Sequence, residues 1–194
     1  MKGCNKMNVL FVNACVREES RTKVLADAVL KKLGGTVTEV NLNDSDLQPL
    51  NREHLNYRSE RAGRRDYSDP MFDHAKAFAA ADVIVVAAPY WDLSYPAVLK
   101  IYIEQVMVDG LTFLFSEQGI PTGLCKAQKL IYVSTAGGKV YGGNMGYDNV
   151  KVLAEAFWGI KETMLFQTED LDVWGVDIKA QLDKTVAEIE QSNL

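Results

Sequence analysis

Short apolar runs alternate along this chain with longer segments in which apolar residues recur at helical spacing. Runs of strand length occupy residues 8–13, 36–42, 82–88, 129–134 and 160–167. The run at 82–88 is apolar almost throughout, which is typical of a central strand in a parallel sheet that is covered on both faces. The run at 36–42 alternates apolar and polar residues, and this pattern favours an edge strand. The rhythm predicts an α/β protein with a five-stranded parallel sheet.

The segments between and after these runs predict five helices, at 20–33, 71–81, 94 or 95 to about 108, 149–158 and 176–191. Right-handed crossovers leave few topologies, and strand order 2-1-3-4-5 with helices on both faces is the common five-stranded one. In sheets with this strand order, ligands bind beyond the carboxyl ends of the strands, at the point where the strand order reverses. The loops after strands one, three and four are therefore expected to form the site.

Residues 43–70 interrupt this rhythm, because they are polar, weakly periodic and longer than an ordinary connection. We interpret them as an insertion or lid within a single domain spanning 1–194, with a flexible tail at 1–6. A charge run of this kind is usually a solvated surface. We favour that interpretation over a specific site formed by Arg58, Arg61, Arg64 and Arg65.

Composition narrows the class of protein further. The chain has 194 residues, 47% hydrophobic and 24% charged, which fits one globular domain with a full core. The net charge of −5 offers no general attraction for nucleic acid, and no apolar segment reaches the roughly 18 residues that span a bilayer. Cys4, Cys15 and Cys125 are odd in number and widely spaced, which indicates free thiols and a cytoplasmic protein. With His54 and His74 as the only histidines, no metal site is expected.

The loop after strand one ends in Ser20, Arg21 and Thr22 at the start of a predicted helix. Hydroxyl groups and free backbone N–H groups at a helix N-terminus bind phosphate, and Arg21 can add positive charge. The alternative is an ordinary helix cap without a ligand, because serine and threonine cap many helices. This loop by itself leaves the two interpretations open.

The same loop contains Cys15-x5-Arg21-Thr22, a spacing that is similar to the phosphate loop of low-molecular-weight tyrosine phosphatases. Glu18 and Glu19 argue against that function, since acidic groups would disfavour both a thiolate and a bound dianion. An Asp-Pro general acid near the C-terminus is also absent from the sequence. We therefore interpret Cys15 as a small buried residue and keep the phosphatase as a rival hypothesis.

The loop after strand three is the most informative segment, because it exposes two large aromatic residues at the predicted binding edge. Its residues 88–94, with Pro96, Leu99, Lys100 and Tyr102, resemble the flavodoxin-like NAD(P)H-quinone reductase and FMN-dependent azoreductase family. The loop after strand four, 134–143, resembles the T-x-G-G segment of the same family.

The resemblance implies an FMN site at these loops. It assigns one edge of the flavin to the loop after strand three and the other edge to the loop after strand four, with the phosphate at the first helix. It also associates Tyr141 with catalysis. The family usually has asparagine where this chain has Asp92, so a backbone contact with the flavin is expected there. The cofactor-binding residues assigned in this way are Ser20, Arg21, Thr22, Pro89, Tyr90, Trp91, Asp92, Leu93, Thr135, Gly137 and Gly138.

The implied activity is an NAD(P)H-dependent flavin oxidoreductase. FMN, rather than FAD, would take a hydride from NADH or NADPH and pass electrons to a quinone-like or azo acceptor in a ping-pong mechanism. Family members commonly form homodimers, so a homodimer is expected. Two alternatives remain at this stage: a flavodoxin-type electron carrier, and a phosphatase-like enzyme that uses Cys15 and Arg21.

Overall fold

The computed structural model describes residues 6–194. Cys4 and nearly all of the expected N-terminal tail lie outside the described residues. The helices are α1 (Arg21–Leu33), α2 (Arg52–Gly63), η1 (Pro70–Phe72), α3 (Asp73–Ala80), α4 (Ala97–Val106), α5 (Met145–Leu153), η2 (Ala154–Trp158) and α6 (Ile178–Gln191). The strands are β1 (Asn8–Asn13), β2 (Thr36–Asn41), β3 (Val83–Ala87), β4 (Phe113–Phe115), β5 (Pro121–Gly123), β6 (Lys129–Thr135) and β7 (Glu162–Thr168).

Five strands form one parallel sheet in the order β2-β1-β3-β6-β7, which confirms the predicted topology. The register places Val9 of β1 beside Val83 of β3, and Val83 beside Lys129 of β6. β2 lies at an edge, as its alternating pattern predicts, and most of its residues are exposed. β4 and β5 form a separate antiparallel pair between α4 and β6. The chain reverses its direction of crossover between β1 and β3, so the switch point lies there.

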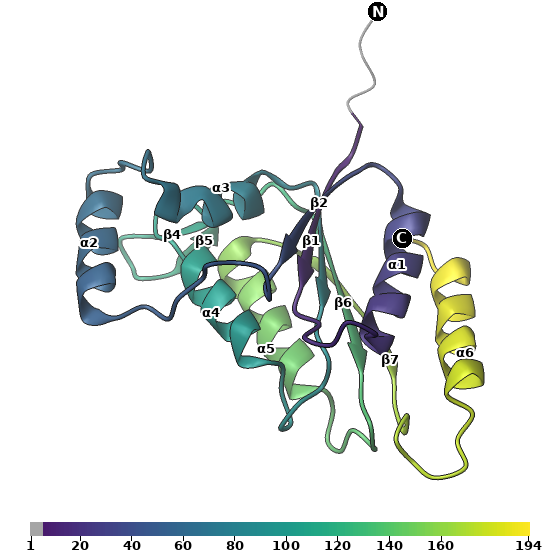
Figure 1. The fold of residues 1–194 in the computed structure, drawn as a ribbon. Coiled ribbons are helices and arrows are strands. Elements are labelled where there is room, and N and C mark those ends of the chain that lie inside the picture. The colour runs from purple at the N-terminus through teal and green to yellow at the C-terminus, as the bar shows by residue number, and fades with distance from the viewer. Residues whose placement is uncertain (1–5) are drawn as a thin grey trace, which may run out of the picture.

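The alternation of side chains along each central strand divides the core into two layers. α3, α4 and α5 cover one face, and α1 and α6 cover the other (Figure 1). The first layer takes Leu10, Val12, Ile84, Val86, Leu130 and Tyr132 from the sheet. The second layer takes Val9, Phe11, Val83, Val85, Ile131 and Val133. Because both faces are buried, the three central strands are continuous apolar runs.

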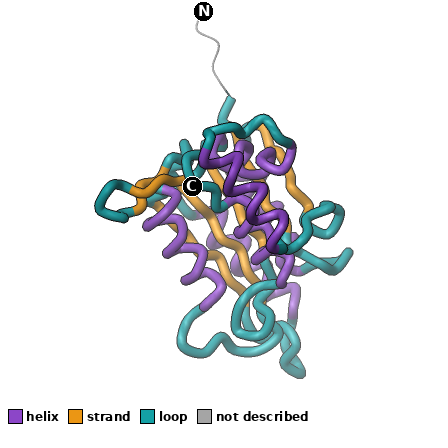
Figure 2. Tube along the Cα trace, turned by 90° about the vertical axis from the view of Figure 1, so that its left-hand side faces the viewer, coloured by secondary structure: helices purple, strands orange, loops and turns teal. Residues whose placement is uncertain are grey.

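The carboxyl ends of the parallel strands meet at one edge of the sheet. Figure 2 shows long loops, in teal, gathered at the lower end of the molecule, beyond this edge. Buried strands place these loops rigidly, since each begins where a fully paired strand ends. No helix among residues 6–194 is long and apolar enough to cross a membrane.

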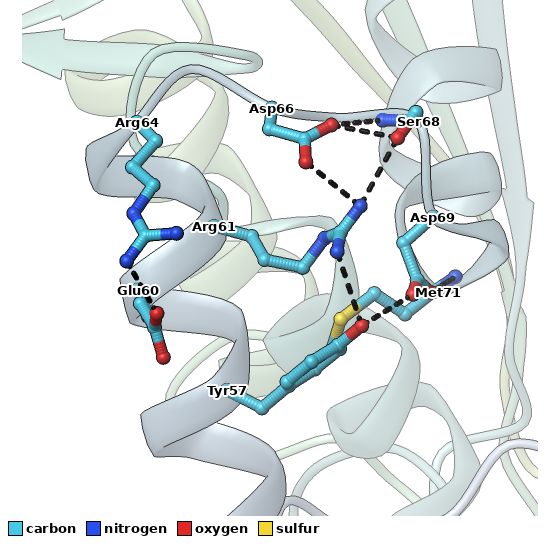
Figure 3. A network of polar contacts seen from close by, with 8 residues as sticks. All are labelled: Tyr57, Glu60, Arg61, Arg64, Asp66, Ser68, Asp69 and Met71. Atoms are coloured by element: carbon cyan, nitrogen blue, oxygen red, sulfur yellow. Dashed lines mark hydrogen bonds and ion pairs between the residues drawn. The ribbon is translucent and has the colours of Figure 1, made fainter.

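The segment 43–70 contains a helix, α2, that its sequence does not predict. Only Ala62 of α2 is buried, so the helix has no apolar stripe for a pattern to reveal. Polar contacts stabilise it instead (Figure 3). Arg61 pairs with Asp66 at 2.8 Å and donates to Ser68 at 3.0 Å, and Tyr57 donates to Asp69 at 2.8 Å.

The four arginines considered as a possible site, Arg58, Arg61, Arg64 and Arg65, all have partners within the protein. Arg58 donates to the Glu104 backbone oxygen at 2.6 Å, and Arg64 pairs with Glu60 at 2.7 Å. Arg65 pairs with Asp109 at 3.4 Å. The contacts of Arg58 and Arg65 tie this segment to the body of the protein, and those of Arg61 and Arg64 stabilise it from within. The arginines therefore have structural roles, which argues against an anion site here.

Candidate active site

The N-terminus of α1 is open to receive an anion. Ser20 is the N-cap, and its side chain accepts a hydrogen bond from the Lys23 backbone N–H at 3.4 Å. The first turn carries no acidic residue. The backbone N–H groups of Arg21 and Thr22 precede the first intrahelical hydrogen bonds, and the helix dipole adds partial positive charge at this end. This geometry agrees with the phosphate cradle expected from the sequence.

Arg21 reaches away from the helix axis toward the loop after β7. Its Nη1 atom pairs with an Asp172 carboxylate oxygen at 2.6 Å and donates to the Leu171 backbone oxygen at 3.0 Å. The Arg21 side chain is about one third exposed, with 33% of its surface accessible. Asp172 therefore offsets part of the charge that Arg21 brings to the cradle.

The loop after β3 makes a tight two-residue turn. Trp91 and Ser94 exchange both backbone hydrogen bonds, at 3.2 and 2.8 Å. The two central residues, Asp92 and Leu93, have φ of 50° and 62°, the pattern of a type I′ turn. Aspartate tolerates this conformation, whereas leucine does so at a cost of about 1 kcal/mol. Backbone strain of this kind is concentrated at functional sites.

The three predicted loops are bonded to one another. The backbone N–H of Tyr90 donates to the Thr135 oxygen at 2.9 Å, which joins the loop after β3 to the end of β6. The buried hydroxyl groups of Thr22 and Thr135 lie 2.6 Å apart, so α1 is joined to the same point. Thr22 and Thr135 were both expected at the cofactor site, and the structure places them in direct contact.

These loops enclose a cavity of about 190 Å³ at the carboxyl edge of the sheet. Its lining includes eight of the residues expected to bind the cofactor: Ser20, Arg21, Thr22, Pro89, Tyr90, Trp91, Thr135 and Gly137. The other expected site residues lie outside the lining: Asp92, Leu93, Gly138 and Tyr141. Leu93 and Tyr141 are 57% and 75% exposed, so their side chains face solvent.

The cavity also contains residues that were not expected from the sequence. Leu171 and Asp172, in the loop after β7, line it, as do Val16, Arg17, Glu19 and Ala136. Of the two acidic residues that argue against a phosphatase, Glu19 lines this cavity and Glu18 does not. The sequence could have indicated Leu171 and Asp172, because they follow the last predicted strand and every strand of a parallel sheet ends at the same edge. The switch-point rule alone misses them, since it singles out only the loops nearest the reversal of strand order.

Two glycines of the loop after β6 have different surroundings. A Cβ atom on Gly137 would lie within 3 Å of the Asp172 carboxylate, so a larger residue there would have to displace that exposed side chain from its position beside Arg21. A Cβ atom on Gly138 would have no heavy atom within 4 Å. Gly138 thus borders open space.

Cys15 does not have the environment of a phosphatase nucleophile. Its side chain is buried in the core, and its Sγ atom points to the Ala87 backbone oxygen at 3.9 Å. Burial raises the pKa of the Cys15 thiol, and burial raises the pKa of Cys125 to about 12. Both are free thiols. Since catalytic cysteines need a lowered pKa, the structure argues against the phosphatase hypothesis.

The two histidines lie away from this site. His54 and His74 line a separate cavity of about 400 Å³ beside α2 and α3. Burial lowers the pKa of His74, whose ring packs edge-on against Tyr102 at 5.6 Å. Among residues 6–194, no group of three or more His, Cys, Asp or Glu side chains is arranged to hold a metal ion.

A parallel sheet of this strand order, with a cavity beyond the carboxyl ends of its strands, defines the doubly wound class of α/β proteins, which bind ligands at that edge. The chain belongs to the flavodoxin-like fold family, whose model matches residues 7–192.

Relatives share nearly the whole length of the chain. An FMN-dependent NADH:quinone oxidoreductase from Clostridium perfringens strain SM101 is 30% identical, over 92% of this chain and 93% of its own. FMN-dependent NADH:quinone oxidoreductase 2 from Clostridium acetobutylicum is also 30% identical, over 94% and 96%.

Solved structures support the same fold. An azoreductase from Bacillus anthracis strain Sterne superposes with a TM-score of 0.80 at 24% identity, covering 94% of this chain and 96% of its own. An FMN-dependent NADH-azoreductase from Bacillus anthracis strain Ames Ancestor, in complex with FMN, gives 0.75 at 19% identity, over 95% and 96%.

Proposed function

We propose that this protein is an FMN-dependent oxidoreductase that takes a hydride from NADH and passes electrons to a quinone-like or azo acceptor. The observation that carries the proposal is the convergence of the α1 N-terminus, the strained aromatic loop and the loop after β6 on one cavity. Full-length relatives named FMN-dependent NADH:quinone oxidoreductases support the same activity. Bound FMN would supply the redox chemistry, and the protein would bind and orient it.

The residues present fit FMN. Ser20 and the N–H groups of Arg21 and Thr22 would hold the phosphate at the end of α1. The turn at Trp91–Ser94 would lie along one edge of the ring, and the open side of Gly138 along the other. The Tyr90 hydroxyl group is buried and has no hydrogen-bond partner among residues 6–194, so it is available to a ligand. Tyr141 would stand at the rim, near the acceptor.

Several broader features belong to the same proposal. The electron transfer would proceed in two half-reactions, with NAD⁺ leaving before the acceptor binds. The chain would act as one domain in the cytoplasm and as a homodimer, with the segment 43–70 as an insertion or lid. Exposed apolar side chains, Leu93 and Tyr141 among them, support burial by a second copy.

The decisive experiment is the visible spectrum of the purified protein, followed by an assay of NADH oxidation with a quinone. We expect flavin absorption bands, either as purified or after FMN is added, and NADH oxidation that depends on the acceptor. A colourless protein that binds no added FMN would refute the proposal. Flavin binding without NADH oxidation would instead indicate an electron carrier.

Asp92→Asn tests whether the turn binds the flavin through its backbone. Asparagine adopts positive φ as readily as aspartate, so the turn should keep its shape. Removing a carboxylate from beside an electron-rich reduced ring should leave FMN affinity unchanged or increase it. Fluorescence titration with FMN measures this. A large loss of affinity would show that the carboxylate itself is needed.

A further inference from the structure

A chain of polar side chains fastens the loop after β6 to the strand beside it. Glu169, just beyond β7, accepts a hydrogen bond from the Val140 backbone N–H at 3.0 Å and another from Gln167 at 2.7 Å. Gln167 in turn accepts from Asn144 at 2.6 Å. Asn144 is the N-cap of α5 and accepts from the Tyr147 backbone N–H at 2.9 Å. We call Asn144, Gln167 and Glu169 the β7 clamp.

The clamp has a fixed direction of hydrogen bonding. A backbone N–H stands at each end, from Tyr147 and from Val140, and each can only donate. Because the Asn144 oxygen is taken by Tyr147, its amide NH₂ must face Gln167. The Gln167 oxygen is then occupied, and its own NH₂ must face position 169. Two donors therefore converge on position 169, and only a side chain with two acceptor oxygens and no donor satisfies both.

The segment held by the clamp is the one assigned to the flavin. Val140 lies two residues beyond Gly138, and Tyr141 comes next. The backbone supports the same arrangement, since the N–H of Asp172 donates to the Gly137 oxygen at 2.7 Å. Beyond Gly138, however, the loop is largely exposed, and within the described residues 6–194 the bond to Glu169 is the hydrogen bond that fixes it before Asn144.

We propose that Glu169 is a positioning residue, which sets the flavin-facing loop from Gly137 to Tyr141 by accepting hydrogen bonds from Val140 and Gln167. This inference rests on the proposed function, because it concerns the same cofactor site. It assigns Glu169 no contact with the flavin. Its effect would pass through the position of the loop backbone.

The direction of the clamp allows a sharp test with three variants. Glu169→Gln is nearly isosteric, yet it places an amide NH₂ against one of the two donors. Gln167→Glu places two carboxylates side by side. The double variant, Gln167→Glu with Glu169→Gln, satisfies every bond again: Asn144 and the amide introduced at position 169 both donate to the carboxylate introduced at position 167, and Val140 donates to the amide oxygen.

We expect each single variant to weaken FMN binding about tenfold, since a hydrogen bond to a charged group is lost. The double variant should return to within about threefold of the wild type, because the bonds are restored. Hydrogen exchange in the FMN-free protein gives a second readout: peptides containing Val140 should exchange faster in the single variants and at the wild-type rate in the double variant.

Glu162→Gln is the matched control, because it removes the same charge from the other end of β7, where Glu162 pairs with Lys129 at 3.0 Å. It should leave FMN binding unchanged. A merely structural role for Glu169 would lower the melting temperature without changing the FMN dissociation constant of the folded protein. Equal FMN binding by wild type and Glu169→Gln, or a double variant no better than the singles, would overturn the inference. A wild type that binds no FMN would refute the proposed function itself, and this role with it.

Discussion

Ser20→Asp should lower FMN affinity about a hundredfold or more, because it places a carboxylate beside the phosphate dianion at the end of α1. The fold should not suffer, since aspartate is as good an N-cap as serine and can accept the same hydrogen bond from the Lys23 N–H. The loss should shrink as salt concentration rises, because part of the repulsion is screened. Fluorescence titration at low and high salt measures both effects.

Ser20→Asn is the matched control for this charge. Asparagine has nearly the same shape as aspartate and caps helices equally well, so FMN affinity should stay close to that of the wild type. Melting curves of the FMN-free proteins should agree within a few degrees. If aspartate and asparagine reduced the affinity equally, the phosphate would not lie at the α1 N-terminus.

Gly138→Val should weaken FMN binding about tenfold or more, while the FMN-free protein keeps its stability. The protein has no heavy atom within 4 Å of a Cβ atom at this position, so the new side chain meets nothing until a ligand approaches. A flavin lying along this edge would collide with it. The melting temperature without FMN and the dissociation constant for FMN separate these two effects.

Gly63→Val provides the comparison, because a Cβ atom on Gly63, at the end of α2, would likewise have no heavy atom within 4 Å. It should leave FMN affinity unchanged. Unaltered binding by Gly138→Val would show that the loop after β6 does not approach the flavin. A fall in the stability of the FMN-free protein would contradict the open surroundings of Gly138.

The local pattern of apolar residues predicts those helices and strands that are stabilised by burying apolar side chains. The continuous apolar run at 82–88 predicts β3, which the structure places at Val83–Ala87 in the middle of the sheet. α2 escapes such a prediction, because it is stabilised by ion pairs and hydrogen bonds and buries only Ala62. α5 begins at Met145 rather than at 149, since Asn144 caps it within a glycine-rich stretch that is typical of a loop.

Some features of the site can be recognised from neighbouring residues, whereas others depend on residues far apart in the sequence. Ser20 is recognisable from sequence, because a helix N-terminus and its cap lie within a few residues of one another. The partner of Arg21 is not recognisable in this way, since Asp172 lies 151 residues further along the chain. The strain at Leu93 also escapes the sequence, because leucine gives no sign of a positive φ.

Apolar and polar patterns are enough to predict the layered α/β architecture, the strand order and the edge at which the cofactor loops meet, because burial on two faces and right-handed crossover leave few alternatives. Which side chains touch at that edge depends on the folded chain as a whole. Folding brings Thr22 to Thr135 across 113 residues and sets Glu169 against Val140. Such contacts depend on the register of the strands and on hydrogen-bond direction, which those patterns do not encode.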